Sequence, residues 1–265
     1  MPDPGDAATR RRRTTGIAAV TLTVAALGAG VIGMFGAETP GVPPAALASR
    51  LPDAPPSAAE VPPAAPSVSL DDSSWELQLW SVQPHHVGLH YGQNHRYGFE
   101  IDVHDGTAPR TALPAKPATA GQIADPASVT WQDGPDRWMR VRTTKPMTAA
   151  EMLSLLGKIR ATPPVLASPL KSAQVPDGLE IGAFTSEPEA NTLVLCPAAV
   201  LGKAPLDSRC FSMFVSPAGT TESASPRDPL PVRQYRKIGA YTVEINSSRA
   251  NAQAALTLLN SVQLN

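Results

Sequence analysis

An uncharged run from Thr14 to Ala37 constrains the topology of this chain more than any other feature of its sequence. A helix needs roughly 20 apolar residues to span the hydrocarbon core of a bilayer, and this run is long enough. Four arginines, 10–13, precede it, and the positive-inside rule places such a cluster in the cytoplasm. We therefore predict a cytoplasmic tail at 1–13 and a transmembrane signal anchor at 14–37 in the cell membrane. The remaining chain would be extracytoplasmic.

A cleaved signal peptide is the alternative to an anchor. Its apolar region is normally about 7–15 residues long and ends at a small-residue cleavage site. The run here is longer, and the pattern Ala46-Leu47-Ala48, which fits the A-x-A rule, lies well past its end. The paired arginines also permit twin-arginine export, but the residues after them do not strengthen that interpretation. We therefore favour an uncleaved anchor.

Positions 38–67 form a segment rich in proline and alanine, which holds nine of the 29 prolines. Such a composition cannot bury a hydrophobic core and favours an extended, fairly stiff chain. We predict a linker that holds a folded part, 68–265, away from the membrane. The formal net charge of the chain is −1, and the folded part lacks the clustered basic residues of a nucleic-acid binder. We therefore expect no nucleic-acid partner.

The folded part is predicted to contain two related repeats, 68–163 and 164–265. The first ends WQDGPDRWMRVRTTKPMTAAEMLSLLGKIR and the second ends YRKIGAYTVEINSSRANAQAALTLLNSVQ; both combine a turn, an alternating strand, a polar break and a helix. Alternating apolar residues earlier in each half indicate further antiparallel strands. We predict an α+β fold in which each half is an antiparallel sheet followed by one packed C-terminal helix. Chance similarity of two strand–helix endings is the alternative to duplication.

The two predicted helices present apolar residues at helical spacing. Thr148 and Glu151 form a capping box at the start of the first helix. The apolar positions of the two helices are Met152, Leu155, Leu156 and Ile159 in the first, and Ala255, Leu258, Leu259 and Val262 in the second.

A signal anchor, a Pro/Ala linker and the pattern of strand, Leu-Leu helix and final Ser-Val resemble extracytoplasmic parts of single-pass membrane proteins of high-GC Gram-positive bacteria, among them anti-sigma-factor-like outer or accessory domains. The residues that carry the resemblance are Gly239, Tyr241, Val243, Ile245, Leu258, Leu259, Ser261 and Val262, echoed by Trp131, Gly134, Trp138 and Val141. The resemblance implies an outside module. It does not imply a sigma-factor inhibitor, which would need a cytoplasmic domain.

The two cysteines, Cys196 and Cys210, both lie in the predicted outside part. An oxidising compartment favours a disulfide between them. The bond would close a loop of about 15 residues, worth ~3 kcal/mol in the chain-entropy model. Two buried free thiols are the alternative.

All five histidines fall between positions 85 and 104, in the stretch HHVGLHYGQNHRYGFEIDVH. We predict a β-hairpin at 87–104 with its turn at GQNHR. Alternation then places four side chains on one face, with His85 or His86 near its end; the four are His90, Glu100, Asp102 and His104. Imidazole and carboxylate groups suit zinc or copper, so these four residues are the predicted metal ligands. The alternative is a polar strand face without a ligand, because outward strand positions are polar by rule.

The sequence indicates a binding protein and not an enzyme. It contains no G-x-S-x-G elbow, no Gly-rich phosphate loop and no HExxH motif. We predict an accessory module, without a resident cofactor, that contacts envelope proteins or cell-wall components. Trp80, which alternation places opposite Trp75, Leu77 and Leu79, is the predicted partner contact; packing on a second face is the alternative. The alternative function is a metal- or small-ligand-binding envelope sensor that uses the hairpin 85–104.

Overall fold

The computed structural model describes residues 60–201, 209–219 and 232–265, all of which belong to one compact unit. The predicted tail, anchor and most of the linker lie outside these residues. Among the described residues, no helix is long and apolar enough to cross a membrane. The fold begins earlier than the predicted linker boundary at 67, because strand β1 (Glu60–Val61) already pairs with strand β9 (Leu170–Gln174).

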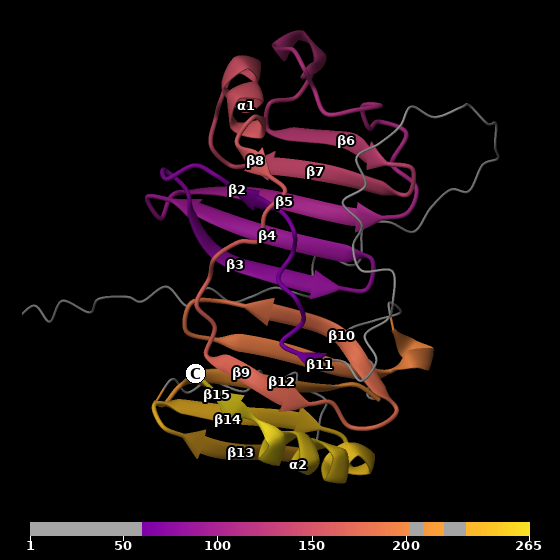
Figure 1. Ribbon diagram of the computed structural model, residues 1–265, viewed down its shortest axis with the longest axis vertical. Helices are drawn as coiled ribbons and strands as arrows, with labels where there is room; N and C mark the ends of the chain where they lie inside the picture. Colours follow the sequence, from indigo (N-terminus) through magenta and orange to yellow (C-terminus); the bar gives the residue numbers. More distant parts are fainter. Residues whose placement is uncertain (1–59, 202–208, 220–231) are drawn as a thin grey trace, which may run out of the picture. The chain divides into compact units, whose positions relative to one another are not determined.

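Ten antiparallel strands form one continuous sheet, which dominates the structure (Figure 1). From one edge to the other, its strands are β13 (Val232–Ile238), β14 (Tyr241–Ser247), β12 (Phe211–Pro217), β11 (Asn191–Pro197), β10 (Leu179–Ser186), β3 (Glu76–Gln83), β4 (His86–Gln93), β5 (Tyr97–Asp105), β7 (Arg137–Thr143) and β6 (Ser128–Gly134). Strands from both halves of the chain therefore share one sheet.

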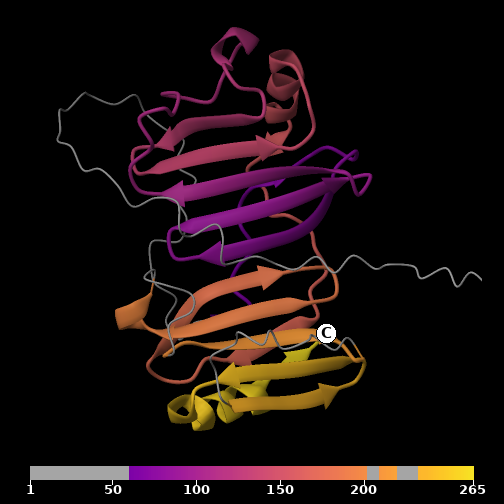
Figure 2. The same ribbon diagram turned by 180° about the vertical axis from the view of Figure 1, so that it is seen from behind.

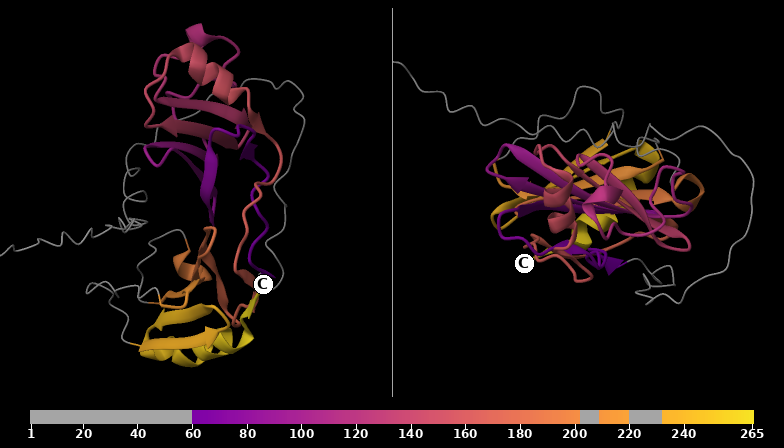
Figure 3. Two further views of the ribbon diagram at one scale, coloured as in Figure 1. Left: turned by 90° about the vertical axis from the view of Figure 1, so that its left-hand side faces the viewer. Right: turned by 90° about the horizontal axis from the view of Figure 1, so that it is seen from above.

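One face of this sheet carries both α-helices and the short strands (Figures 1 and 3). Helix α1 (Ala149–Leu156) starts at the predicted capping box of Thr148 and Glu151, and α2 (Ala252–Ser261) follows β14. The short strands are β2 (Ser69–Leu70), β8 (Ile159–Arg160), β15 (Gln263–Leu264), β1 and β9, and short 3₁₀ helices lie at η2 (Ala120–Gln122), η3 (Ala198–Val200) and η4 (Arg249–Asn251). Apolar side chains of the sheet pack beneath the helices as one core; Phe99, Ile101, Val141, Leu193, Met213 and Ile245 are each fully buried there. The opposite face is seen in Figure 2.

The structure corrects the predicted fold class. The described residues are mainly β, and the halves do not form the separate sheets expected of the predicted α+β fold. They join where β3 pairs with β10, with Ser81 opposite Thr185. This pairing satisfies the backbone hydrogen-bonding groups that two edge strands would otherwise expose. Because the partners lie about a hundred residues apart, no local sequence pattern reveals it.

The strand order is nevertheless the same in the two halves when counted outward from this junction. It runs β3-β4-β5-β7-β6 on one side and β10-β11-β12-β14-β13 on the other. In each half an α-helix follows the last long strand in chain order, which is β7 in the first half and β14 in the second. A short strand after the helix, β8 or β15, then pairs with a short strand that precedes the half's long strands, β2 or β9. Positions in the two halves can therefore be compared strand by strand.

Trp80 does not lie where simple alternation predicts. A β-bulge interrupts β3 between Leu77 and Leu79, and the extra residue reverses the alternation beyond it. Trp80 therefore points into the core, where it is 5% exposed and packs against Phe184 at a ring-centroid distance of 5.3 Å. Trp80 is therefore not the exposed contact that alternation predicts, and it does not pack on a second face either, because it belongs to the same core as Trp75.

The predicted disulfide is confirmed: Cys196, in β11, is bonded to Cys210, the residue before β12. Both half-cystines are buried in a small cluster with Val200. The bond ties together two neighbouring strands of the second half across the connection between them.

Replacing both cysteines by serine should lower the free energy of unfolding by about 3 kcal/mol, because the unfolded chain gains the freedom of the opened loop. Denaturant unfolding with and without a reductant measures this. Reductant should lower the stability of the native protein to a similar extent and should leave the double variant unchanged. A native protein that is insensitive to complete reduction would contradict this prediction.

Candidate functional site

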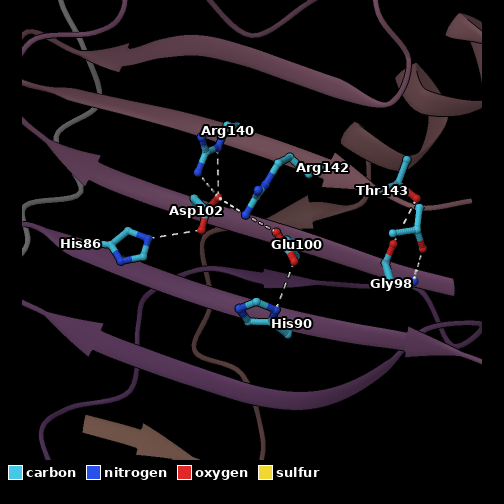
Figure 4. Close-up of polar contacts among 9 residues, drawn as sticks. His86, His90, Gly98, Glu100, Asp102, Arg140, Arg142 and Thr143 are labelled. Carbon is cyan, nitrogen blue, oxygen red and sulfur yellow. Dashed lines mark hydrogen bonds and ion pairs between the residues drawn. The ribbon is translucent and has the colours of Figure 1, made fainter. Parts of the chain in front are cut away.

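The predicted hairpin forms from β4 and β5, and it places His86, His90 and His104 on the face opposite the core. Its register sets His86 opposite His104, Gly88 opposite Asp102, and His90 opposite Glu100. Strand β7 continues these three rows with Trp138, Arg140 and Arg142 respectively. We call this set the histidine face; it comprises His86, His90, Glu100, Asp102, His104, Trp138, Arg140 and Arg142. Figure 4 labels all of them except His104 and Trp138.

Glu100 contacts side chains of both neighbouring strands. Arg142 forms an ion pair with Glu100 Oε2, and His90 Nδ1 lies 3.5 Å from Glu100 Oε1 (Figure 4). The side chains of His90 and Glu100 are each 30% exposed, and that of Arg142 is 32% exposed. This row is therefore fixed in position and still reachable from solvent.

Asp102 forms the buried centre of the face. Its Oδ2 accepts hydrogen bonds from Arg140 Nε and Nη2 at 3.1 and 3.0 Å, and its Oδ1 lies 3.2 Å from His86 Nε2. Burial acts to raise the pKa of Asp102, but the hydrogen bond from His86 and the charge of Arg140 outweigh it and lower the pKa to about 2. The carboxylate is therefore ionised at neutral pH.

Three rings stack in the third row. The centroids of His86 and His104 lie 4.5 Å apart, and those of His104 and Trp138 lie 3.9 Å apart with their planes within 9°. Burial, together with the charge of His86, lowers the pKa of His104 to about 4, so its ring is neutral at pH 7. The buried Nε2 of His104 has no hydrogen-bond partner among the residues that the structure describes.

The four residues predicted as metal ligands share one face, but they do not form one cluster. His90 contacts Glu100, which also forms an ion pair with Arg142. Asp102 and His104 instead form a cluster with His86. One ligand atom from each of these last three residues lies within 4.8 Å of the others.

The other two histidines lie in turns, and β7 adds three residues to the histidine face. His85 and His95 occupy turns with positive φ of 64° and 53°. Sequence reasoning missed Trp138, Arg140 and Arg142 as members of the face. The alternation in RWMRVRT was the signal for them, because it separates these three from the buried Met139 and Val141.

No family model, no curated protein and no solved structure matches this chain. The chemistry of the site has to be inferred from its own geometry.

The second half of the sheet provides an internal comparison. In the first half, Ser81, Gly88, Asp102 and Arg140 lie side by side on β3, β4, β5 and β7. Their counterparts in the second half are Thr185, Thr192, Phe214 and Glu244 on β10, β11, β12 and β14. The row that matches His90, Glu100 and Arg142 holds Val194, Ser212 and Asn246. The row that matches His104 and Trp138 holds Ser216 and Thr242. Glu244 is the single ionisable side chain among these positions of the second half. The general rule that outward strand positions are polar therefore does not account for the charged cluster in the first half.

Stability should fall as the pH is lowered from about 6.5 to about 4, in metal-free buffer. His104 has a lowered pKa in the folded state, so the unfolded chain binds more protons in this window and the free energy of unfolding decreases. Because the side chain of His104 is partly exposed and solvent screens its charge, we expect a loss of about 1–2 kcal/mol. A further loss should follow between pH 3.8 and about 2, where the folded protein keeps Asp102 ionised longer than the unfolded chain does.

Urea unfolding at pH 7 and pH 4.5 measures the first loss. The matched control is His104→Phe, which keeps a flat ring against Trp138 and removes the titrating nitrogens. The variant should lose less stability than the native protein over this interval. An equal loss in both proteins would show that other groups cause the pH dependence.

Proposed function

We propose that this chain is a membrane-anchored, extracytoplasmic binding module whose histidine face binds a partner protein of the cell envelope. The observation that carries the proposal is the concentration of ionisable and aromatic side chains on three strands of the first half, at positions whose counterparts in the second half are almost uncharged. Both halves have the same strand order, so this strand order does not itself require the ionisable side chains of the first half.

The composition of the face suits a protein partner. It combines two arginines, three histidines and a tryptophan, and β4, β5 and β7 contain no lysine. Arginine and aromatic residues are enriched in protein interfaces, whereas lysine is depleted. Arg140 and Arg142 are already held by carboxylates, so less side-chain entropy is lost when a partner binds.

The face also favours binding over catalysis. Arginine holds both of its carboxylates, and Asp102, with a pKa of about 2, does not exchange protons at neutral pH. General acid–base chemistry needs a pKa near the working pH. We therefore propose a module that is not an enzyme.

Two observations support the extracytoplasmic location. A disulfide between Cys196 and Cys210 suits an oxidising compartment. The apolar run at 14–37 and the proline-rich segment after it have the composition of an anchor and a spacer. Tethering at the membrane would raise the local concentration of the module near a membrane-bound partner.

Site-specific photo-cross-linking in intact cells tests the proposal. A photoreactive amino acid replaces His90 in one full-length protein and Ser212, from the row matching that of His90 in the second half, in another. We expect a discrete protein adduct from position 90 and little or none from position 212. Equal adducts from both positions, or none from position 90, would contradict the proposal. An adduct that a muramidase releases and a protease does not would identify a wall polymer and also overturn the protein partner.

A further inference from the structure

We propose that His86, Asp102 and His104 form a binding site for a divalent transition-metal ion, for which zinc is the probe. The inference goes beyond the proposed function, because a partner protein could bind the histidine face with or without a metal. It replaces the ligand set predicted from the sequence, which contains His90 and Glu100 in place of His86.

The three side chains lie close enough together to converge on a small ion. A ligand atom from each lies within 4.8 Å of the other two, and His86 Nε2 is 3.2 Å from Asp102 Oδ1. Two ligands that each lie about 2.0–2.2 Å from a tetrahedral zinc ion are ~3.3–3.6 Å apart. Two imidazoles and one carboxylate are a common protein donor set for zinc, which leaves a fourth position for water or a partner group.

The second observation is the orphaned nitrogen of His104. Its Nε2 is buried and has no hydrogen-bond partner among the described residues. A buried polar atom without a partner costs free energy, so such an atom in a folded protein requires an explanation. The ring is stacked between His86 and Trp138, which restricts its rotation toward solvent. We assign this nitrogen as the ligand atom of His104, and a metal ion in the cluster would then give it a partner.

The surroundings of Asp102 leave one of its oxygens for the ion. Arg140 binds Oδ2, whereas Oδ1 contacts only His86 among the hydrogen bonds to this carboxylate. The hydrogen bonds from Arg140 to Oδ2 would fix the orientation of a ligating carboxylate. Gly88 lies opposite Asp102 on β4, and a Cβ there would stand 3.7 Å from Oδ1 and 3.6 Å from the His86 ring. A Cβ at this position would also stand 3.1 Å from Ser81 Oγ, so glycine leaves the space between Ser81, His86 and Asp102 free of a further side chain. The nearby guanidinium groups repel a dication, so we expect micromolar affinity.

The experiment is a calorimetric titration of zinc into the metal-stripped, full-length protein in detergent. We expect one site of micromolar affinity. His86→Ala and His104→Phe should each weaken binding at least ~tenfold, whereas the matched control, His90→Ala with Glu100→Gln, should change it less than ~twofold. Thermal unfolding checks that each variant is folded; if His104→Phe is not, His86→Ala decides the result.

Several results would overturn the site. They are the absence of binding heat, binding that survives His86→Ala, binding that is lost equally in the control, and equally strong binding of magnesium, which would indicate carboxylates alone. Repeating the cross-linking from position 90 with a chelator present separates this inference from the proposed function. A persistent adduct leaves the partner site standing even if the zinc titration is flat, and zinc binding without any adduct leaves only the metal site.

Discussion

Replacing Trp80 by alanine should lower the free energy of unfolding by about 3–5 kcal/mol. The indole is 5% exposed and packs against Phe184, so its removal leaves a cavity lined by both halves of the protein. The cavity lies beside the β3–β10 junction, which joins the halves into one sheet through three facing residue pairs. Denaturant unfolding of the full-length chain, followed by circular dichroism, measures the loss.

Leu79 provides the matched control. It is the neighbour of Trp80 and also large and apolar, but the bulge places it on the opposite face of the sheet, where it is half-buried. Leu79→Ala should therefore cost about 1 kcal/mol or less. Similar small losses for the two variants would contradict the register of β3 and would restore Trp80 as a surface residue.

Replacing Asp102 by alanine should lower the free energy of unfolding by about 3–5 kcal/mol at pH 7. Asp102 is 4% exposed and ionised, and its removal leaves Arg140 and His86 without the carboxylate that binds them. The substitution removes three hydrogen bonds to an ionised carboxylate, and each bond of this kind contributes about 1.5–3 kcal/mol. The same unfolding experiment measures this loss.

Glu100→Ala is the control for Asp102, because Glu100 lies on the same strand and also contacts an arginine and a histidine. The side chain of Glu100 is 30% exposed, whereas that of Asp102 is 6% exposed, so water already screens the interactions of Glu100. The expected loss is about 1 kcal/mol or less. If the two variants were equally stable, Asp102 would not be the buried centre of the face.

Local patterns predicted the hairpin and its polar face correctly. Alternation in YGFEIDVH separates the buried Phe99 and Ile101 from Glu100 and His104, and the GQNHR turn closes at Asn94 and His95. Capping by Thr148 and the Leu-Leu pairs likewise located both helices, but Ile159 lies in β8 and Val262 lies just after α2, so both predicted helices were too long. These features depend on residues close together in the sequence, so sequence periodicity reveals them.

The features that sequence reasoning missed depend on contacts between distant segments. The β3–β10 pairing links residues about a hundred positions apart. Because of it, the protein has one ten-stranded sheet where two separate α+β halves were expected. The bulge near Gln78 has no proline or glycine to mark it, and it reversed the predicted side of Trp80. The grouping of His86 with Asp102 follows from the exact cross-strand register of β4 and β5, which alternation alone does not fix.

Exchanging the charges of Glu100 and Arg142 tests the function of the histidine face most directly. The variant Glu100→Arg with Arg142→Glu keeps opposite charges at facing positions of β5 and β7 but loses the contact of Arg142 Nη2 with Asp102 Oδ2 at 3.7 Å, so its stability should fall by about 1–2 kcal/mol. The measurement is the yield of the protein adduct from a photoreactive residue at position 90 in cells. If the face binds a partner protein, the exchange should reduce this yield at least ~tenfold while the protein stays folded. An unchanged yield in a folded variant would contradict the account, because the partner would then not read the charges of this face.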